Sequence, residues 1–280
     1  MSKICLHETQ VALSAYFRTS VLLVLCVIGI CAAPAAPQVA STSARQPSLP
    51  LVVRDPGAIT LLQGSIVALG GLAALRAVSA WTIDSTVTST RDSTSHAVRY
   101  EVSGDEFRIE HKAPGASAPM VTFTSGHGRA SIKGQGGATR IPPHVTHAWI
   151  VSPMIAQMLQ RQLDSAHFSI SDKGPSPDGT QEIIQTVNEA STLDHMVTPQ
   201  TWYIDKTTLL PAKIIVHEYG PNSTRIFAQI GWTFADYRPV SGVMVPFTTA
   251  RLLGDTVAET TVVNRIEFKA ISDDHFAPQQ

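Results

Sequence analysis

The spacing of apolar residues changes along the chain, and it first predicts a helical segment. Between residues 58 and 78 the apolar positions recur every three or four residues, as one face of a helix requires, at Ile59, Leu62, Ile66 and Leu69. Gly70 and Gly71 predict a helix end, followed by a second short helical turn. Because this run contains Gln63, Ser65 and several glycines, we expect it to pack against a sheet rather than cross a membrane.

From Trp81 onwards the period falls to two, which is typical of strands with one buried and one solvated face. A hairpin is clearest around residues 103–105, where apolar residues alternate with charged ones on both sides of the turn, at Val98, Tyr100, Val102, Phe107 and Ile109. Further strands are predicted over residues 120–123, 168–171, 182–188, 201–205, 212–219, 226–237, 243–252 and 257–268. Pro239 and Gly242 are predicted to turn the chain between two of them.

A second helix is predicted to interrupt the strands. Ser152 can cap it, Pro153 suits its first position, and its apolar stripe consists of Ile155, Met158, Leu159 and Leu163. No repeat of fixed period and no second linker follow, so one antiparallel, mainly β (α+β) domain is the economical interpretation.

The N-terminus predicts an export segment. Lys3 and Arg18 precede an uncharged apolar run, residues 20–33, which is short for a spanning helix and is followed by small residues and prolines. We therefore expect a signal peptide over residues 1–33, with a retained membrane anchor as the alternative and lipidation of Cys31 left open. Residues 34–56 are predicted to be a flexible linker, and residues 57–280 a single domain.

Composition excludes several function classes. The formal net charge is -1 and no block of Lys or Arg occurs, so we expect no nucleic-acid partner. All three cysteines, Cys5, Cys26 and Cys31, lie in the export segment, which leaves the body without disulfides. The chain has no phosphate loop, dinucleotide fingerprint, GxSxG or HExxH motif. His144 and His147 could share a helix face, but no partner supports a metal site. We predict no cofactor, no metal and no enzymatic activity, with a hydrolase as the less expected alternative.

Several segments in order resemble one known family. They are the helix and strand over residues 58–90, followed by YEVSGDEFRIEH, FTSGHGRASIKG, WYIDKTTLLPAKIIVHEYG, FADYRPVSGVMVPF and NRIEFKAISDDHFAP. Together they are similar to the outer-membrane lipoprotein-sorting carriers, the LolA-like superfamily. The resemblance implies a strongly curved antiparallel sheet, an unclosed half-barrel, with helices over its concave face. In that family the concavity accepts acyl chains, and some members act as sensors.

The resemblance and the pattern together give the functional hypothesis. We expect a periplasmic or secreted protein that binds a lipid or lipoprotein acyl chain, as carrier or sensor, with N-terminal membrane anchoring as a possibility. The alternative is a protein- or peptide-interaction module with an envelope partner. An apolar ligand needs no polar motif, because each buried methylene contributes about 0.8 kcal/mol. The predicted cavity residues, each of which could equally be a plain core residue, are Trp81, Ile83, Tyr100, Phe107, Ile155, Met158, Leu159, Ile230, Trp232 and Phe234.

Overall fold

A computed structural model describes residues 51–104, 106–126, 129–134, 137–141, 155–191, 196, 198–219 and 226–277. These residues belong to one compact unit, Ser48–Gln280. The helices are α2 (Pro56–Ala68), α3 (Gly71–Ala77), α4 (Ile155–Asp164) and the short 3-10 helix η2 (Asp273–Phe276). The strands are β1 (Ala80–Ser89), β2 (Ser95–Ser103), β3 (Glu106–Lys112), β4 (Val121–Gly126), β5 (Arg129–Gly134), β6 (Gly137–Ile141), β7 (Phe168–Pro175), β8 (Gln181–Asn188), β9 (Gln200–Asp205), β10 (Pro211–Tyr219), β11 (Ile226–Val240), β12 (Val243–Leu253) and β13 (Thr256–Phe268).

All these strands form a single 13-stranded sheet in the order β6-β5-β4-β3-β2-β1-β13-β12-β11-β10-β9-β8-β7. The sheet is therefore two antiparallel meanders, β1–β6 and β7–β13, which are joined where the first strand pairs with the last. The two edge strands, β6 and β7, do not pair with each other, so the sheet is not closed. The predicted mainly β, unclosed architecture is confirmed.

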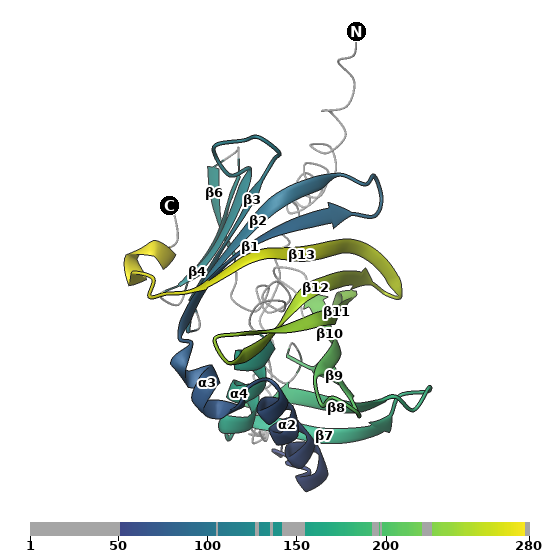
Figure 1. The fold of residues 1–280 in the computed structure, drawn as a ribbon. Coiled ribbons are helices and arrows are strands. Elements are labelled where there is room, and N and C mark those ends of the chain that lie inside the picture. Colours follow the sequence, from purple (N-terminus) through teal and green to yellow (C-terminus); the bar gives the residue numbers. More distant parts are fainter. Residues whose placement is uncertain are drawn as a thin grey trace, which may run out of the picture. The chain divides into compact units, whose positions relative to one another are not determined.

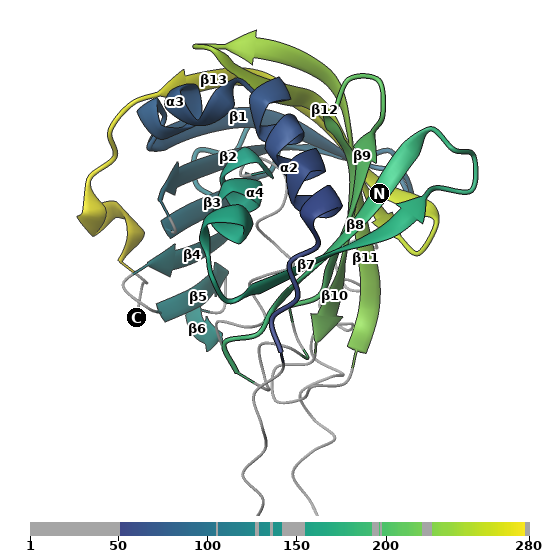
Figure 2. The same ribbon diagram turned by 90° about the horizontal axis from the view of Figure 1, so that it is seen from below.

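The sheet curves around its helices. Figures 1 and 2 show α2, α3 and α4 lying inside the arc that the strands make. Register shifts occur in five of the strand pairs, between β1 and β13, β10 and β11, β9 and β10, β12 and β13, and β7 and β8. An extra residue in one strand bends it and increases its twist, so these shifts help the long sheet to curve. The face toward the helices is concave, and the opposite face is convex.

The chain joins this sheet before the first helix begins. Arg54 forms a parallel bridge with Ile170 of the edge strand β7, and its guanidinium donates to the carbonyl oxygens of Leu163 and Ser165 at 2.8 and 2.9 Å. The carboxylate of Asp55 then caps α2 by accepting from the backbone N–H of Ala58 at 2.9 Å. A bridged edge strand offers fewer unpaired backbone groups to other chains, and the cap fixes where α2 starts.

The predicted glycine stop ends α2 at a tight corner. Gly70 has a φ of 120°, and a Cβ built on it would lie 2.2 Å from the carbonyl oxygen of Gly242. The backbone N–H of Met244 in β12 donates to the carbonyl oxygen of Leu69 at 2.9 Å. This contact between the α2–α3 corner and the β11–β12 hairpin is close because Gly70 has no side chain.

The prediction that Pro239 turns the chain is wrong. Strand β11 continues through Pro239, which lies opposite Met244, and the turn consists of Ser241 and Gly242 with φ values of 48° and 84°. Two positive φ values are characteristic of a two-residue hairpin loop. The pair that flanks such a loop, Val240 and Val243, is hydrogen-bonded, and the next pair, Pro239 and Met244, is not. Pro239 therefore needs no N–H donor toward β12, and proline is tolerated there.

None of the described helices is long and apolar enough by itself to cross a bilayer. Only α2 and α3 taken together reach the required length and composition, and the chain bends by 59° between them.

Candidate functional site

The concave face is lined by rows of apolar side chains that run across the strands. In one row Ile184, Trp202, Ile214 and Trp232 stand directly opposite one another on β8, β9, β10 and β11. On the other meander, Ile83 of β1 stands opposite Tyr100 of β2, which in turn faces Ile109 of β3. Residues directly opposite on neighbouring strands point to the same side. The two halves of the sheet therefore present their apolar rows to a common interior.

The ten residues predicted from the sequence all lie in this interior. Eight are buried with at most 8% of their surface exposed, and Tyr100 and Met158 are half-buried against the same hydrophobic cluster. Seven come from β1, β2, β3 and β11, and three come from the inward side of α4. Helices α2, α3 and α4 pack against these side chains in the same hydrophobic cluster.

Sequence reasoning missed a second set of interior residues. Three of its fully buried members are Trp202 of β9 and Leu62 and Leu69 of α2. The signal for Trp202 was present in the strict alternation of β9, where Gln200, Trp202 and Ile204 are buried and their neighbours are half-buried. The two leucines were recognised as part of a helix stripe expected to pack against a sheet, but they were not included among the predicted cavity residues.

The interior also contains polar atoms. The indole Nε1 atoms of Trp81 and Trp202 are buried and have no hydrogen-bond partner among the described residues. Gln162 of α4 donates from Nε2 to Oε1 of Gln200 in β9 at 2.5 Å, and this bond ties the helix to the sheet. A buried donor without a partner is rare, so the two indoles mark places where a bound polar atom would be stabilised.

Two histidines lie on the concave side of β2 and β3. His96 stands opposite Val87 and His111 opposite Val98, and both of these valines are buried in the core. The rings stack with centroids 5.2 Å apart, and His96 Nε2 lies 3.0 Å from His111 Nδ1. Burial, with a smaller contribution from His96, lowers the pKa of His111 to about 4. His111 is therefore neutral at pH 7.

A cleft of about 480 Å³ lies between α3, α4 and the start of β1. Its lining includes Leu75 and Val78 as apolar residues and Arg76, Arg161 and Asp164 as charged ones. The Gln157 side chain donates to the carbonyl oxygen of Val78 at 3.1 Å and connects the two walls. This cleft borders two of the helices that cover the concave face.

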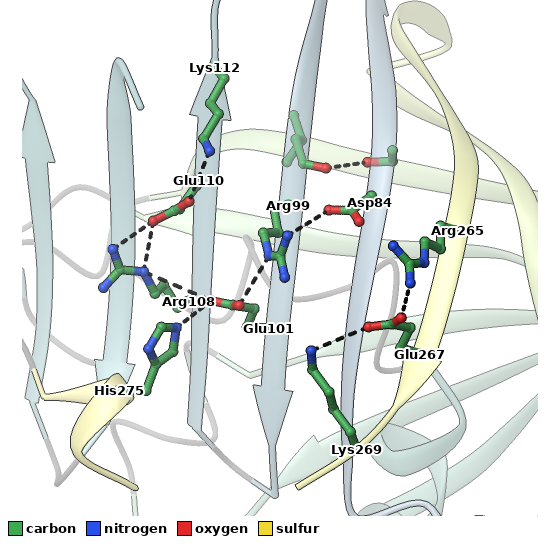
Figure 3. A network of polar contacts seen from close by, with 12 residues as sticks. Asp84, Arg99, Glu101, Arg108, Glu110, Lys112, Arg265, Glu267, Lys269 and His275 are labelled. Atoms are coloured by element: carbon green, nitrogen blue, oxygen red, sulfur yellow. Dashed lines mark hydrogen bonds and ion pairs between the residues drawn. The ribbon is translucent and has the colours of Figure 1, made fainter. Parts of the chain in front are cut away.

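The convex face of β1, β2 and β3 is polar and carries a network of charges (Figure 3). Arg99 contacts Asp84 at 3.4 Å and Glu101 at 3.1 Å, and Arg108 contacts Glu110 at 2.6 Å. Burial by itself would raise the pKa of Glu101, but its hydrogen bonds and ion pairs with His275 of η2 and Arg99 outweigh burial and lower it. Acidic and basic groups alternate here, so the network is largely self-neutralised.

Within the described residues, no group of three or more His, Cys, Asp or Glu side chains is placed to hold a metal ion. His144 and His147, the candidate pair from the sequence, lie outside the described residues.

Comparison with solved structures relates this geometry to known folds. A domain assigned to the outer membrane lipoprotein-sorting proteins, from Vibrio parahaemolyticus, matches with a TM-score of 0.51 and 12% identity over 79% of this chain and 96% of its own. A LolA superfamily protein from Nitrosomonas europaea matches with a TM-score of 0.50 and 8% identity over 79% and 97%. The chain has the LolA-like fold.

A DUF1329 family protein from Desulfovibrio piger has the same fold, with a TM-score of 0.52 and 9% identity over 78% of this chain and 96% of its own. At these identities the likeness concerns the LolA-like fold alone, because one fold supports many functions. No family model matches the sequence, and no curated protein does.

Proposed function

We propose that the protein binds an acyl chain of a lipid or lipoprotein on the concave face of its LolA-like sheet, as a carrier or a sensor. The observation that carries the proposal is the apolar interior shared by both meanders and covered by helices. The rows of β1–β3 and β8–β11 supply aromatic and aliphatic surface from both sides. Helices α2 and α4 occupy the position that a ligand would take.

Burial energetics support this assignment. Each methylene transferred from water contributes about 0.8 kcal/mol, so one acyl chain can replace the helix contacts it displaces. The interface of α4 with the sheet includes a polar bond, Gln162 to Gln200, besides apolar contacts. A helix held partly by such a bond is suited to detach and return. The fold neighbour from Vibrio parahaemolyticus, a lipoprotein-sorting protein domain, agrees with this role.

Quenching of tryptophan fluorescence by brominated fatty acids tests the proposal directly. The chain has four tryptophans, and after Trp149→Phe the three that remain, Trp81, Trp202 and Trp232, all belong to the concave face. We expect saturable quenching by a fatty acid brominated along its chain and none by the matched unbrominated one. Trp232→Phe should reduce the quenched fraction. Absence of both quenching and lipid uptake would contradict the proposal and favour the interaction module.

We also propose that the protein is exported to the cell envelope, with residues 1–33 as a removable signal peptide and the segment after it as a tether. The apolar run and the small residues behind it support this. The intact mass of protein recovered from the producing cells should equal that of the chain after removal of about the first 33 residues. A mass with Cys31 retained and acylated would instead indicate a lipid anchor, and an unprocessed chain would refute export through a cleaved signal.

A further inference from the structure

The concave face contains a polar segment that the predicted cavity residues do not include. The row that contains Trp232 continues across the next three strands. Trp232 lies opposite Arg251 of β12, Arg251 lies opposite Glu259 of β13, and Glu259 lies opposite Ser89 of β1. The neighbouring row runs from Phe234 through Thr249 and Thr261 to Val87. Its members Phe234, Thr249 and Val87 are buried. Since side chains two residues apart on a strand share a face, Arg251 and Glu259 also point to the concave side.

The ionisation of Tyr100 supports this placement independently. Burial chiefly, and then the charge of Glu259, raise the pKa of Tyr100 to about 12. Tyr100 belongs to the concave face because it lies opposite the buried Ile83. A nearby negative charge disfavours ionisation of a phenol, so this contribution agrees with the strand register, which places Glu259 on the same face as Tyr100. Glu259 therefore faces the interior that the predicted cavity residues line.

The two charges form a loose pair. Arg251 Nη1 lies 3.4 Å from Glu259 Oε2, and the side chains are 32% and 39% exposed. Charge-assisted hydrogen bonds are typically about 2.7–2.9 Å long, and a guanidinium has five donors. On the convex face, by contrast, Arg108 holds Glu110 through two bonds of 2.6 and 3.0 Å. The pair on the concave face thus keeps donors on Arg251 and acceptor capacity on Glu259 for another molecule.

We propose that Arg251 and Glu259 form a headgroup subsite for a zwitterionic phospholipid, in which the phosphate binds the guanidinium and the ammonium binds the carboxylate. This rests on the proposed function, because it names the class of lipid that the concave face binds. The charges favour this class. A purely anionic headgroup would meet the carboxylate of Glu259, and a free fatty acid would leave that carboxylate without a cation. Trp232 is buried and lies directly opposite Arg251, so the apolar surface begins beside the charged pair.

The position of the pair also fixes the direction of the lipid. Glu259 lies opposite Ser89, near one end of β1, whereas Ile83 and Trp81 lie toward the other end, where Gly242 contacts the α2–α3 corner. From Ser89 to Ile83 the strand rises by about 20 Å at roughly 3.3 Å per residue. An acyl chain that starts at the Arg251–Glu259 pair therefore runs parallel to β1 and crosses the apolar rows toward the α2–α3 corner.

Lipid binding by the full-length protein and single variants tests the subsite. The probes are phosphatidylethanolamine and phosphatidylglycerol with identical acyl chains, presented in detergent micelles and measured by displacement of one fluorescent fatty acid. Loss of one charge-assisted contact is expected to weaken binding about tenfold. Arg251→Met should weaken both lipids, and Glu259→Gln should weaken only phosphatidylethanolamine. Arg265→Met and Glu267→Gln, which remove an ion pair of β13 on the convex face, are the matched controls and should change neither.

The possible outcomes separate the subsite from the proposed function. If each lipid displaces the fluorescent fatty acid from Arg251→Met with the same affinity as from the wild type, the subsite is overturned. Acyl-chain binding would remain intact in that case. A protein that takes up neither the fatty acid nor any lipid would overturn the proposed function itself. Equal weakening of both lipids by Glu259→Gln would contradict the ammonium contact. Far-ultraviolet circular dichroism of each variant ensures that unfolding is not mistaken for lost binding.

Discussion

Replacing Trp202 by alanine is expected to lower the free energy of unfolding by about 3–5 kcal/mol, the usual cost of truncating a large buried aromatic side chain. Trp202 is 0% exposed and stands between Ile184 and Ile214 in the row that crosses β8, β9 and β10. Its removal would leave a cavity against three strands at once. Urea denaturation followed by circular dichroism at 222 nm measures the loss, because this signal does not depend on the indole.

Two further variants make that prediction specific. Trp202→Phe keeps one aromatic ring, and the indole N–H that it removes has no hydrogen-bond partner in the described part of the chain. It therefore leaves a smaller cavity than alanine does and should cost less. Tyr203→Ala is the control on the opposite face, where the ring is half-buried and Lys213 Nζ lies 5.3 Å from its centroid. That change should cost about 1 kcal/mol or less. If Trp202→Ala lost no more stability than Tyr203→Ala, the concave core would be loosely packed there.

Replacing Gly70 by valine should destabilise the protein by about 2–4 kcal/mol, since the residue needs a positive φ and its Cβ would collide with backbone. The clash is with the carbonyl oxygen of Gly242, 2.2 Å away, in a rigid two-residue turn. The turn cannot yield without breaking the hydrogen bond from Met244 to Leu69. We therefore expect the α2–α3 corner to separate from the β11–β12 hairpin, with faster amide hydrogen exchange at Met244.

Gly71 provides the matched control for this variant. It too has a positive φ, 81°, but a Cβ on it would meet no atom within 4 Å. Gly71→Val should therefore cost only the backbone strain, about 1–2 kcal/mol, and leave the exchange at Met244 slow. Equal losses at the two glycines would mean that the contact with Gly242 contributes nothing, and that the helices are held by apolar packing alone. Urea denaturation of both variants decides between these outcomes.

Much of the fold could be predicted because the spacing of apolar residues along the sequence matches the side of each helix or strand that is buried. The alternation around Phe107 and the helix stripe of Leu62 gave the right element type, since each element buries one face. The pairing of β1 with β13 could not be predicted from pattern alone, because period two says which face is buried but not which strand is the neighbour. The family resemblance implied a curved, unclosed sheet but did not say which strands are neighbours.

The candidate site, too, could be predicted only in part. Trp232 and Phe234 were predicted from their alternation, but Arg251 and Glu259 were not singled out by any pattern in the sequence. Only the register, which sets Trp232 opposite Arg251 and Arg251 opposite Glu259, places them on the concave side. The shift between Arg251 and Leu252 adds to this difficulty, because a bulge changes which residues face inward and leaves no clear mark in the sequence.

The seam between β1 and β13 has a consequence for how the molecule assembles. The strand at the start of the domain pairs with β2 on one side and with the strand at the end of the domain on the other, so the middle of the sheet cannot form until nearly the whole chain is present. Contacts between residues so far apart in sequence make folding slow, because loop closure must precede any gain from pairing. A nascent chain would therefore emerge as two unjoined hairpin ladders with apolar surfaces exposed, which makes early capture by a chaperone valuable.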